Sequence, residues 1–123
     1  MLVTALHTQF PTVRACTELP ADLEQVLPTV QVTRFGGGTQ DITMDWAIVD
    51  LDIWAATLEA ADILGSQIRT WLELHLAGRT YVGPSGSGTF ARVRTQSGFA
   101  QRPSGNPDVK RIGGVTEFWV HSF

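Results

Sequence analysis

The sequence predicts an α+β fold, in which a mostly antiparallel sheet of about five strands carries one long helix and a short N-terminal helix. Three observations support this prediction. Several segments alternate apolar and polar residues, one segment of about 22 residues has a helical period instead, and Gly and Pro separate these segments. With 123 residues, of which 43% are hydrophobic and 17% charged, the chain fits a single globular domain over 1–123.

The first elements are short. Apolar residues at near-helical spacing predict a helix over residues 2–10, which Pro11 ends because proline cannot continue a helix. Residues 13–19 are predicted as a strand that Pro20 closes, and 21–27 as a loop or one helical turn.

Two further strands follow. Residues 29–35 alternate and are rich in β-forming residues, and a run of three glycines then breaks the pattern. Residues 44–54 form the clearest strand. One face, expected to pack on the core, contains Ala47, Val49, Leu51 and Ile53. The other face, expected to meet solvent or a partner, contains Trp46, Ile48, Asp50, Asp52 and Trp54.

The period changes to that of a helix over residues 55–76. Its apolar stripe contains Ala61, Leu64, Ile68, Trp71 and Leu72. The second half then predicts a flexible turn at 83–88, a strand at 89–100, a loop at 101–108 and a closing strand at 115–123, entered through two glycines. Aromatic residues on both faces of the last strand suggest that both faces are covered, one of them by a neighbouring chain.

No pattern of catalytic, cofactor-binding or metal-ligating residues emerges. The single Cys16 excludes an intrachain disulfide framework, and the three histidines are isolated in the sequence. Residues 83–89 contain three glycines and two serines in the manner of a phosphate loop, but lack its lysine and precede a strand. Asp50 and Asp52 could together bind a hard cation, but a solvated or interface-facing strand is favoured. We expect no enzyme, no cofactor and no metal.

The formal net charge of −3 conceals an asymmetry. Residues 1–62 contain nine acids and two bases, a sum of −7, whereas residues 63–123 contain three acids and seven bases, a sum of +4. The two halves can attract each other within the domain, or they can give its surface an acidic and a basic side. The acidic isoelectric point of about 5.5 argues against sequence-specific nucleic-acid binding. No apolar run is long enough for a membrane span, and no secretory signal is apparent.

Over essentially its full length, the chain resembles the tail-terminator, or tail-completion, proteins of long-tailed (siphovirus-like) bacteriophages. The most characteristic segments are the strand-to-helix junction DLDIWA and the loop RPSGNPD before the last strand. The resemblance implies a mixed α/β fold and a structural virion protein. Such proteins form a hexameric ring that caps the tail tube, ends its polymerisation and offers a docking surface to neck or head-completion proteins.

The partners implied by this resemblance are further copies of the chain, the tail-tube protein and a neck protein. DNA would pass only through the lumen of the ring. The location implied is the tail or neck of the virion, with assembly in the host cytoplasm. Two alternatives stay open: a head-to-tail adaptor of the same virion, and a small α+β ligand-binding domain or enzyme. The latter would show an apolar pocket with convergent polar groups, whereas the structural role predicts no such pocket.

Two sets of residues are candidates for assembly contacts. A closed ring needs two different patches that meet between neighbours. The subunit interface is predicted to pair acids of one copy with arginines of the next, through Asp50, Asp52, Trp54, Arg92, Arg94 and Arg102. The loops at 36–43 and 101–108 are predicted to contact tube or neck along the axis, through Gly36, Gly37, Gly38, Asp41, Ser104, Asn106 and Asp108.

Overall fold

The computed structural model describes residues 2–39, 44–83 and 86–122. Within them the chain is α+β, with two α-helices, one short 3₁₀ turn and six strands. In chain order these are α1 (Leu2–Gln9), β1 (Arg14–Cys16), η1 (Leu23–Gln25), β2 (Thr29–Thr39), β3 (Met44–Ala55), α2 (Leu58–Leu74), β4 (Thr80–Gly83), β5 (Gly86–Arg102) and β6 (Lys110–Ser122).

The strands form one curled sheet in the order β1-β2-β3-β6-β5-β4. The pairing of β1 with β2 is parallel, and the other four strand pairings of the described residues are antiparallel. The predicted α+β class is therefore confirmed, but the sheet is mixed and has one strand more than expected.

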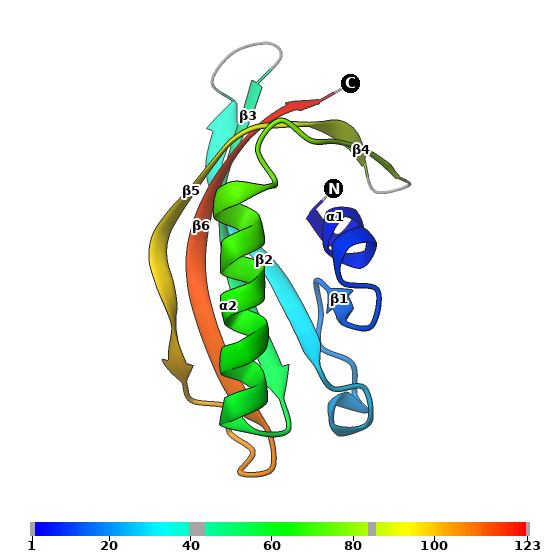
Figure 1. The fold of residues 1–123 in the computed structure, drawn as a ribbon, viewed down its shortest axis with the longest axis vertical. Coiled ribbons are helices and arrows are strands. Elements are labelled where there is room, and N and C mark those ends of the chain that lie inside the picture. Colours follow the sequence, from blue (N-terminus) through cyan, green and yellow to red (C-terminus); the bar gives the residue numbers. More distant parts are fainter. Residues whose placement is uncertain (1, 40–43, 84–85, 123) are drawn as a thin grey trace.

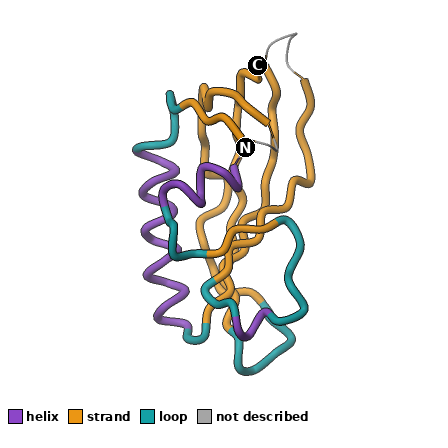
Figure 2. The backbone as a smooth tube through the Cα atoms, turned by 90° about the vertical axis from the view of Figure 1, so that its right-hand side faces the viewer, coloured by secondary structure: helices purple, strands orange, loops and turns teal. Residues whose placement is uncertain are grey.

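The molecule has two layers (Figures 1 and 2). Helix α2 lies along one face of the sheet and contacts β3, β5 and β6, while α1 packs near β1 and β4. Gly65 of α2 is buried against this face, and a Cβ there would lie in ordinary contact with Ile53 at 3.5 Å. The helix begins at Leu58 because the Thr57 side chain caps it, accepting a hydrogen bond from the Ala60 N–H.

The core lies between α2 and the sheet. The predicted core face of residues 44–54 is confirmed for Val49, Leu51 and Ile53, which are buried, whereas Ala47 is only half-buried. The predicted stripe of the long helix is confirmed too, and its buried residues are Ala61, Leu64, Gly65, Ile68, Trp71 and Leu72. These side chains pack with Ile112 and Phe118 of β6 into one apolar cluster.

Several predicted boundaries were wrong. The first strand has three residues instead of seven, β4 was not predicted, and the long helix starts at Leu58 because β3 continues through Ala55. The last strand begins at Lys110 rather than 115. The two glycines predicted as its entrance lie inside it. Gly114 allows close approach of β5, where a Cβ would come within 2.8 Å of the Ser97 carbonyl oxygen.

The three glycines at the end of β2 were predicted to break the strand, but they continue it. The register shifts between Arg34 and Gly36, and pairing with β3 then resumes through Gly38. Gly37 has a φ of +113°, and a Cβ there would collide with the Trp46 carbonyl oxygen. The glycines therefore form an irregular strand rather than a loop.

Candidate functional site

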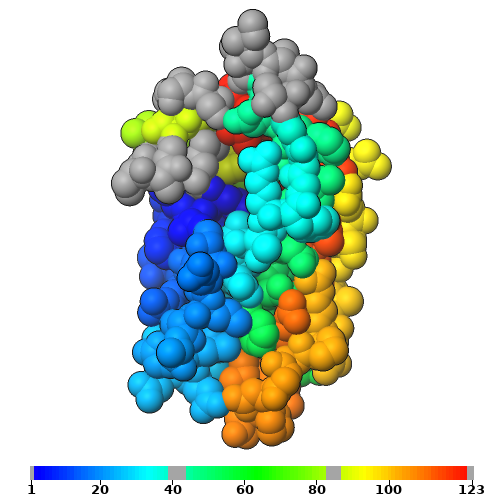
Figure 3. Space-filling view, turned by 180° about the vertical axis from the view of Figure 1, so that it is seen from behind, coloured from blue at the N-terminus to red at the C-terminus, as the bar shows by residue number. Residues whose placement is uncertain are grey.

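The face of the sheet opposite α2 contains most of the predicted interface residues. Figure 3 views the molecule from this side, where β2, β3, β6 and β5 lie at the surface. Because side chains alternate along a strand, the buried Leu51 and Ile53 point toward α2, and Asp50, Asp52 and Trp54 point away from it. The register of the sheet places Trp54 beside Arg111 of β6, and Arg111 beside Arg102 of β5.

Two carboxylates and two guanidinium groups form a cluster at this point. Arg102 Nη1 donates to Asp50 Oδ1 at 2.7 Å and to Asp52 Oδ1 at 3.0 Å. Arg111 binds Asp52 in a bidentate manner, with Nε to Oδ1 and Nη2 to Oδ2 both at 2.9 Å. The Asp52 side chain is 4% exposed, whereas those of both arginines are about one quarter exposed. We call these four residues the charge cluster.

Gly113 and Trp54 complete the surroundings of the charge cluster. Gly113 lies opposite Asp52 in the register, and a Cβ on it would collide with Asp52 Oδ1 and with the Arg102 guanidinium. The Arg111 guanidinium carbon lies 5.1 Å from the centre of the Trp54 ring, a cation–π contact. Trp54 is thereby only 7% exposed. The expectation that Asp52 and Trp54 face solvent or a partner was wrong, because arginines of the same chain cover both.

Charges from the two halves of the chain thus meet within one copy. Burial lowers the pKa of Arg102, but its hydrogen bonds and charge interactions with Asp50 and Asp52 outweigh this and raise it above the ordinary arginine value. Pairing of these residues across a subunit boundary stays a prediction. Sequence analysis missed Arg111, because it placed the start of the last strand after that residue. Arg111 could have been found from its spacing, because it lies an even number of residues before Val115 and Trp119 and so shares their strand face.

Arg92 and Arg94 lie on the same face, nearer the other end of the sheet. The Arg92 guanidinium carbon stacks 4.9 Å from the ring centre of Trp119, and Arg94 is the register partner of Glu117. Both arginines are exposed, and neither has an ion pair with another described residue. They carry positive charge that the described part of the chain leaves available to a partner.

Partly exposed apolar residues surround these two arginines. The half-buried side chains on this part of the face are Trp46, Ile48, Val115 and Trp119. The expectation of exposed aromatic residues therefore holds in part for Trp46 and Trp119, while Phe123 lies outside the described residues. A face that combines half-buried aromatic and exposed arginine side chains has the composition typical of a protein–protein contact.

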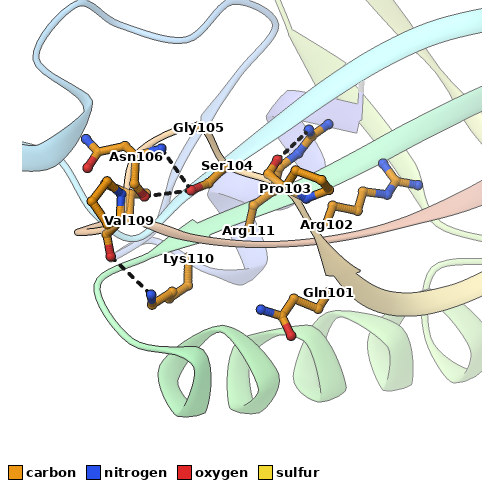
Figure 4. A pocket seen from close by; sticks show the side chains of 10 residues that line it. Gln101, Arg102, Pro103, Ser104, Gly105, Asn106, Val109, Lys110 and Arg111 are labelled. Carbon is orange, nitrogen blue, oxygen red and sulfur yellow. Dashed lines mark hydrogen bonds between the residues drawn. The ribbon is translucent and has the colours of Figure 1, made fainter.

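The loop that follows β5 is held by its own side chains (Figure 4). Ser104 Oγ donates to the Asn106 carbonyl oxygen at 2.7 Å and accepts from the Asn106 N–H at 3.2 Å. The Asp108 N–H donates to Asn106 Oδ1, and the Asn106 amide group donates to Glu24 of η1. With Lys110 and Arg111, the loop lines an open hollow of about 270 Å³. These hydrogen bonds hold the loop in one conformation, so that it presents a preformed surface.

The two predicted axial contacts lie at opposite ends of the molecule. At one end of the sheet, Gly38 of β2 pairs with Trp46 of β3, which pairs with Trp119 of β6. At the other end, Trp54 of β3 pairs with Arg111 of β6, next to residues 103–109. Figure 1 shows the same separation along the longest axis. Asp41 lies outside the described residues.

An apolar hollow of about 430 Å³ lies between the start of α2 and the segment that joins α1 to β1. Its wall contains Phe10, Val13, Leu27, Pro28, Ala55, Ala60, Ile63 and Leu64. Thr12 and Gln67 are the polar residues among those lining it, and no charged residue does so. The hollow is apolar, but its lining lacks the convergent polar groups that the ligand-binding alternative predicts.

Residues 2–39, 44–83 and 86–122 contain no group of three or more His, Cys, Asp or Glu that could hold a metal ion. His7 Nε2 accepts a hydrogen bond from the Ala15 N–H at 3.2 Å, so this imidazole holds α1 against β1. Burial raises the pKa of Cys16, although nearby Arg14 lowers it in part. The predicted turn at 83–88 was too long, because Gly83 ends β4 and residues 86–88 belong to β5, while residues 84–85 lie outside the described range.

In the same described ranges, neither helix has the length and apolar character required to cross a bilayer. No protein-family model and no curated protein sequence matches this chain.

Proposed function

We propose that this chain is a structural virion protein that caps the tail tube of a long-tailed bacteriophage as a ring. In this role it ends tube polymerisation and presents a docking surface to neck or head-completion proteins. The resemblance of the sequence is the starting point, and the α+β architecture agrees with what that resemblance implies.

One structural observation supports the proposal most directly. The two segments expected to contact tube and neck lie at opposite ends of the sheet, one near Gly38 and one at residues 103–109. A ring subunit between a tube and a neck needs two such ends, one for each neighbour along the axis. Its sides are then free for contacts within the ring.

The exposed arginines on the open sheet face support a contact between copies. The charge cluster neutralises two bases of the second half, so Arg92 and Arg94 become the more available interface residues. Exposed charges of this kind contribute little energy each, but they favour one orientation of neighbouring subunits.

The decisive experiment combines the protein with tail-tube protein from the same genome during tube polymerisation. Electron microscopy should show rings at one tube end and a narrower distribution of tube lengths. Unchanged tube lengths and bare tube ends would contradict the proposal. A ring that binds neck protein but leaves tube growth unchanged would favour the head-to-tail adaptor of the same virion.

A small ligand-binding domain is the second candidate, and the apolar hollow beside α2 favours it. This function predicts a compact monomer or dimer at all protein concentrations. Measurement of the mass in solution at several salt concentrations, with and without tubes, separates the two. A monomer that does not bind tubes, and whose unfolding free energy rises when an apolar ligand is added, would support the second candidate.

A further inference from the structure

Strand β5 has a long edge without a neighbouring strand. It spans 17 residues and pairs with β6 on one side, but β4 covers only Gly86–Thr89 on the other. The backbone of Phe90 is still bound on this side, to Arg79 and Gly78, and beyond Phe90 no described residue pairs with the outer edge. Arg92, Arg94 and Gln96 are exposed along it. Its outward N–H and C=O groups are available to a further strand.

Strand β2 has a second such edge on the other side of the sheet. Its 11 residues pair with β3 on one side, whereas β1 covers only Thr29, Val30 and Gln31 on the other. From Val32 onward, no described strand pairs with its outer edge. Thr33 and Arg34 are exposed there, and the Phe35 side chain, 58% exposed, is a large apolar group without cover.

The directions of the two edges are complementary. Each step from β2 to β3, to β6 and to β5 reverses the strand direction, so β2 and β5 run in opposite directions. Rotation about an axis along the strands leaves strand direction unchanged. A neighbour generated by such a rotation therefore brings its β2 antiparallel to β5, in the pairing that is the more stable per residue.

We propose that copies of this chain join by antiparallel pairing of the β5 edge of one copy with the β2 edge of the next. The inference rests on the proposed ring and identifies how its subunits connect. The contact is heterologous, since unlike edges meet, and it leaves the same two edges free at the ends of any open chain. Closure into a ring satisfies both of them.

Charge favours β2 over a second β5 as the occupant, and β2 is also long enough for the pairing. Pairing of two β5 edges would bring Arg92 and Arg94 against the same arginines, and like charges on adjacent strands repel. The register of β5 shifts between Phe90 and Arg92 and again between Thr95 and Ser97, so its regular stretch is Arg92–Thr95. That stretch is short, and the unpaired part of β2 from Val32 onward is long enough to match it.

The placement also agrees with the ends of the molecule. When the strands lie along the ring axis, the Gly38 end and the 103–109 loop lie on the two opposite faces of the ring. Edge pairing therefore uses the sides of the subunit and leaves both axial surfaces free.

Disulfide trapping of the full chain tests this geometry. In a Cys16→Ser background, Thr33→Cys is combined in turn with Arg92→Cys, Arg94→Cys and Gln96→Cys, so that three neighbouring registers are sampled. After assembly on tubes and mild oxidation, at least one pair should give a ladder of covalent dimers, trimers and larger species in a non-reducing gel. The matched control combines Thr33→Cys with Thr70→Cys on the exposed face of α2, and should give no ladder.

Hydrogen exchange provides a second readout without substitutions. Amides of residues 32–35 and 92–95 should exchange faster in the monomer than in assembled rings, by at least tenfold. If rings form but no pair crosslinks and neither edge gains protection, edge pairing is wrong while the capping function stands. If no ring forms in solution or on tubes, the proposed function fails and the inference fails with it.

Discussion

Replacement of Asp52 by asparagine is the sharpest test of the charge cluster. The change keeps the shape of the side chain, removes its charge and replaces one acceptor oxygen with an NH₂ group. Asp52 accepts three hydrogen bonds, from Arg102 Nη1 at 3.0 Å and from Arg111 Nε and Nη2 at 2.9 Å. In the variant, Arg111 faces an amide donor in either orientation of the amide, Arg102 does so in one of the two, and both lose an ionic partner.

The size of the effect follows from burial. Removing one partner from a fully buried ion pair costs about 3–5 kcal/mol. Here the Asp52 side chain is 4% exposed, but those of Arg102 and Arg111 are 24% and 26% exposed, so water can partly solvate the orphaned guanidinium groups. We therefore expect Asp52→Asn to lower the free energy of unfolding by about 3 kcal/mol, at the lower end of that range.

Two matched variants provide reference values for the loss of unfolding free energy. Asp50 is 28% exposed and makes one bond to Arg102, so Asp50→Asn should cost about 1 kcal/mol. Glu73 belongs to a surface pair with Arg69 on α2, and Glu73→Gln should cost about 0.5 kcal/mol or less. Urea unfolding of the monomer at neutral pH measures all three, with an unchanged denaturant slope as the check on two-state behaviour. A cost for Asp52→Asn no larger than that for Glu73→Gln would refute the reasoning.

Three further predictions test other parts of the structure. Gly113→Ala should destabilise the monomer by about 2–3 kcal/mol in urea unfolding, because its Cβ displaces the Arg102 guanidinium from Asp52; a neutral result would mean that the cluster relaxes freely. Thr57→Ala should cost about 1 kcal/mol in the same assay through loss of the α2 cap, whereas Thr57→Ser should preserve stability. Cys16 should react with iodoacetamide more slowly than a free thiol at pH 8, because burial raises its pKa. The pKa of Cys16 is raised in the folded state only. The thiol therefore contributes to stability at a pH below its pKa in the unfolded chain. This contribution is lost as the pH rises through its pKa in the folded protein. Thus Cys16→Ser should flatten the loss of stability at alkaline pH; equal slopes would contradict this.

Local pattern accounts for the layer architecture. The alternation of residues 44–54 and the helical stripe from Ala61 to Leu72 depend on which side of one element is apolar, and that information lies within a few neighbouring residues. The structure buries Leu51, Ile53, Ile68 and Leu72 accordingly. The end of α1 near Pro11 is a local signal of the same kind. The Thr57 cap is local too, but it was not predicted, and the helix was expected to start at residue 55.

Glycine was ambiguous in the sequence because its meaning depends on what lies across the sheet. Gly36, Gly37 and Gly38 looked like a break, yet they continue β2, and the backbone of β3 comes close to Gly37. Gly113 and Gly114 looked like the entrance to a strand, yet they lie within β6 and make room for Arg102 and for β5. The sequence alone does not distinguish a glycine that permits a turn from one that permits close contact between two strands.

The sequence by itself determined that this protein is an α+β domain with one long amphipathic helix and two halves of opposite charge, because periodicity and composition are local or additive properties. Only the tertiary structure decided which charges meet. Asp52 and Arg111 are 59 positions apart, and the register between β3 and β6 brings them together in one copy. It also decided which strand edges are left unpaired, since that depends on how far β1 and β4 extend along their neighbours. Register and strand order are long-range choices that no short stretch of residues contains.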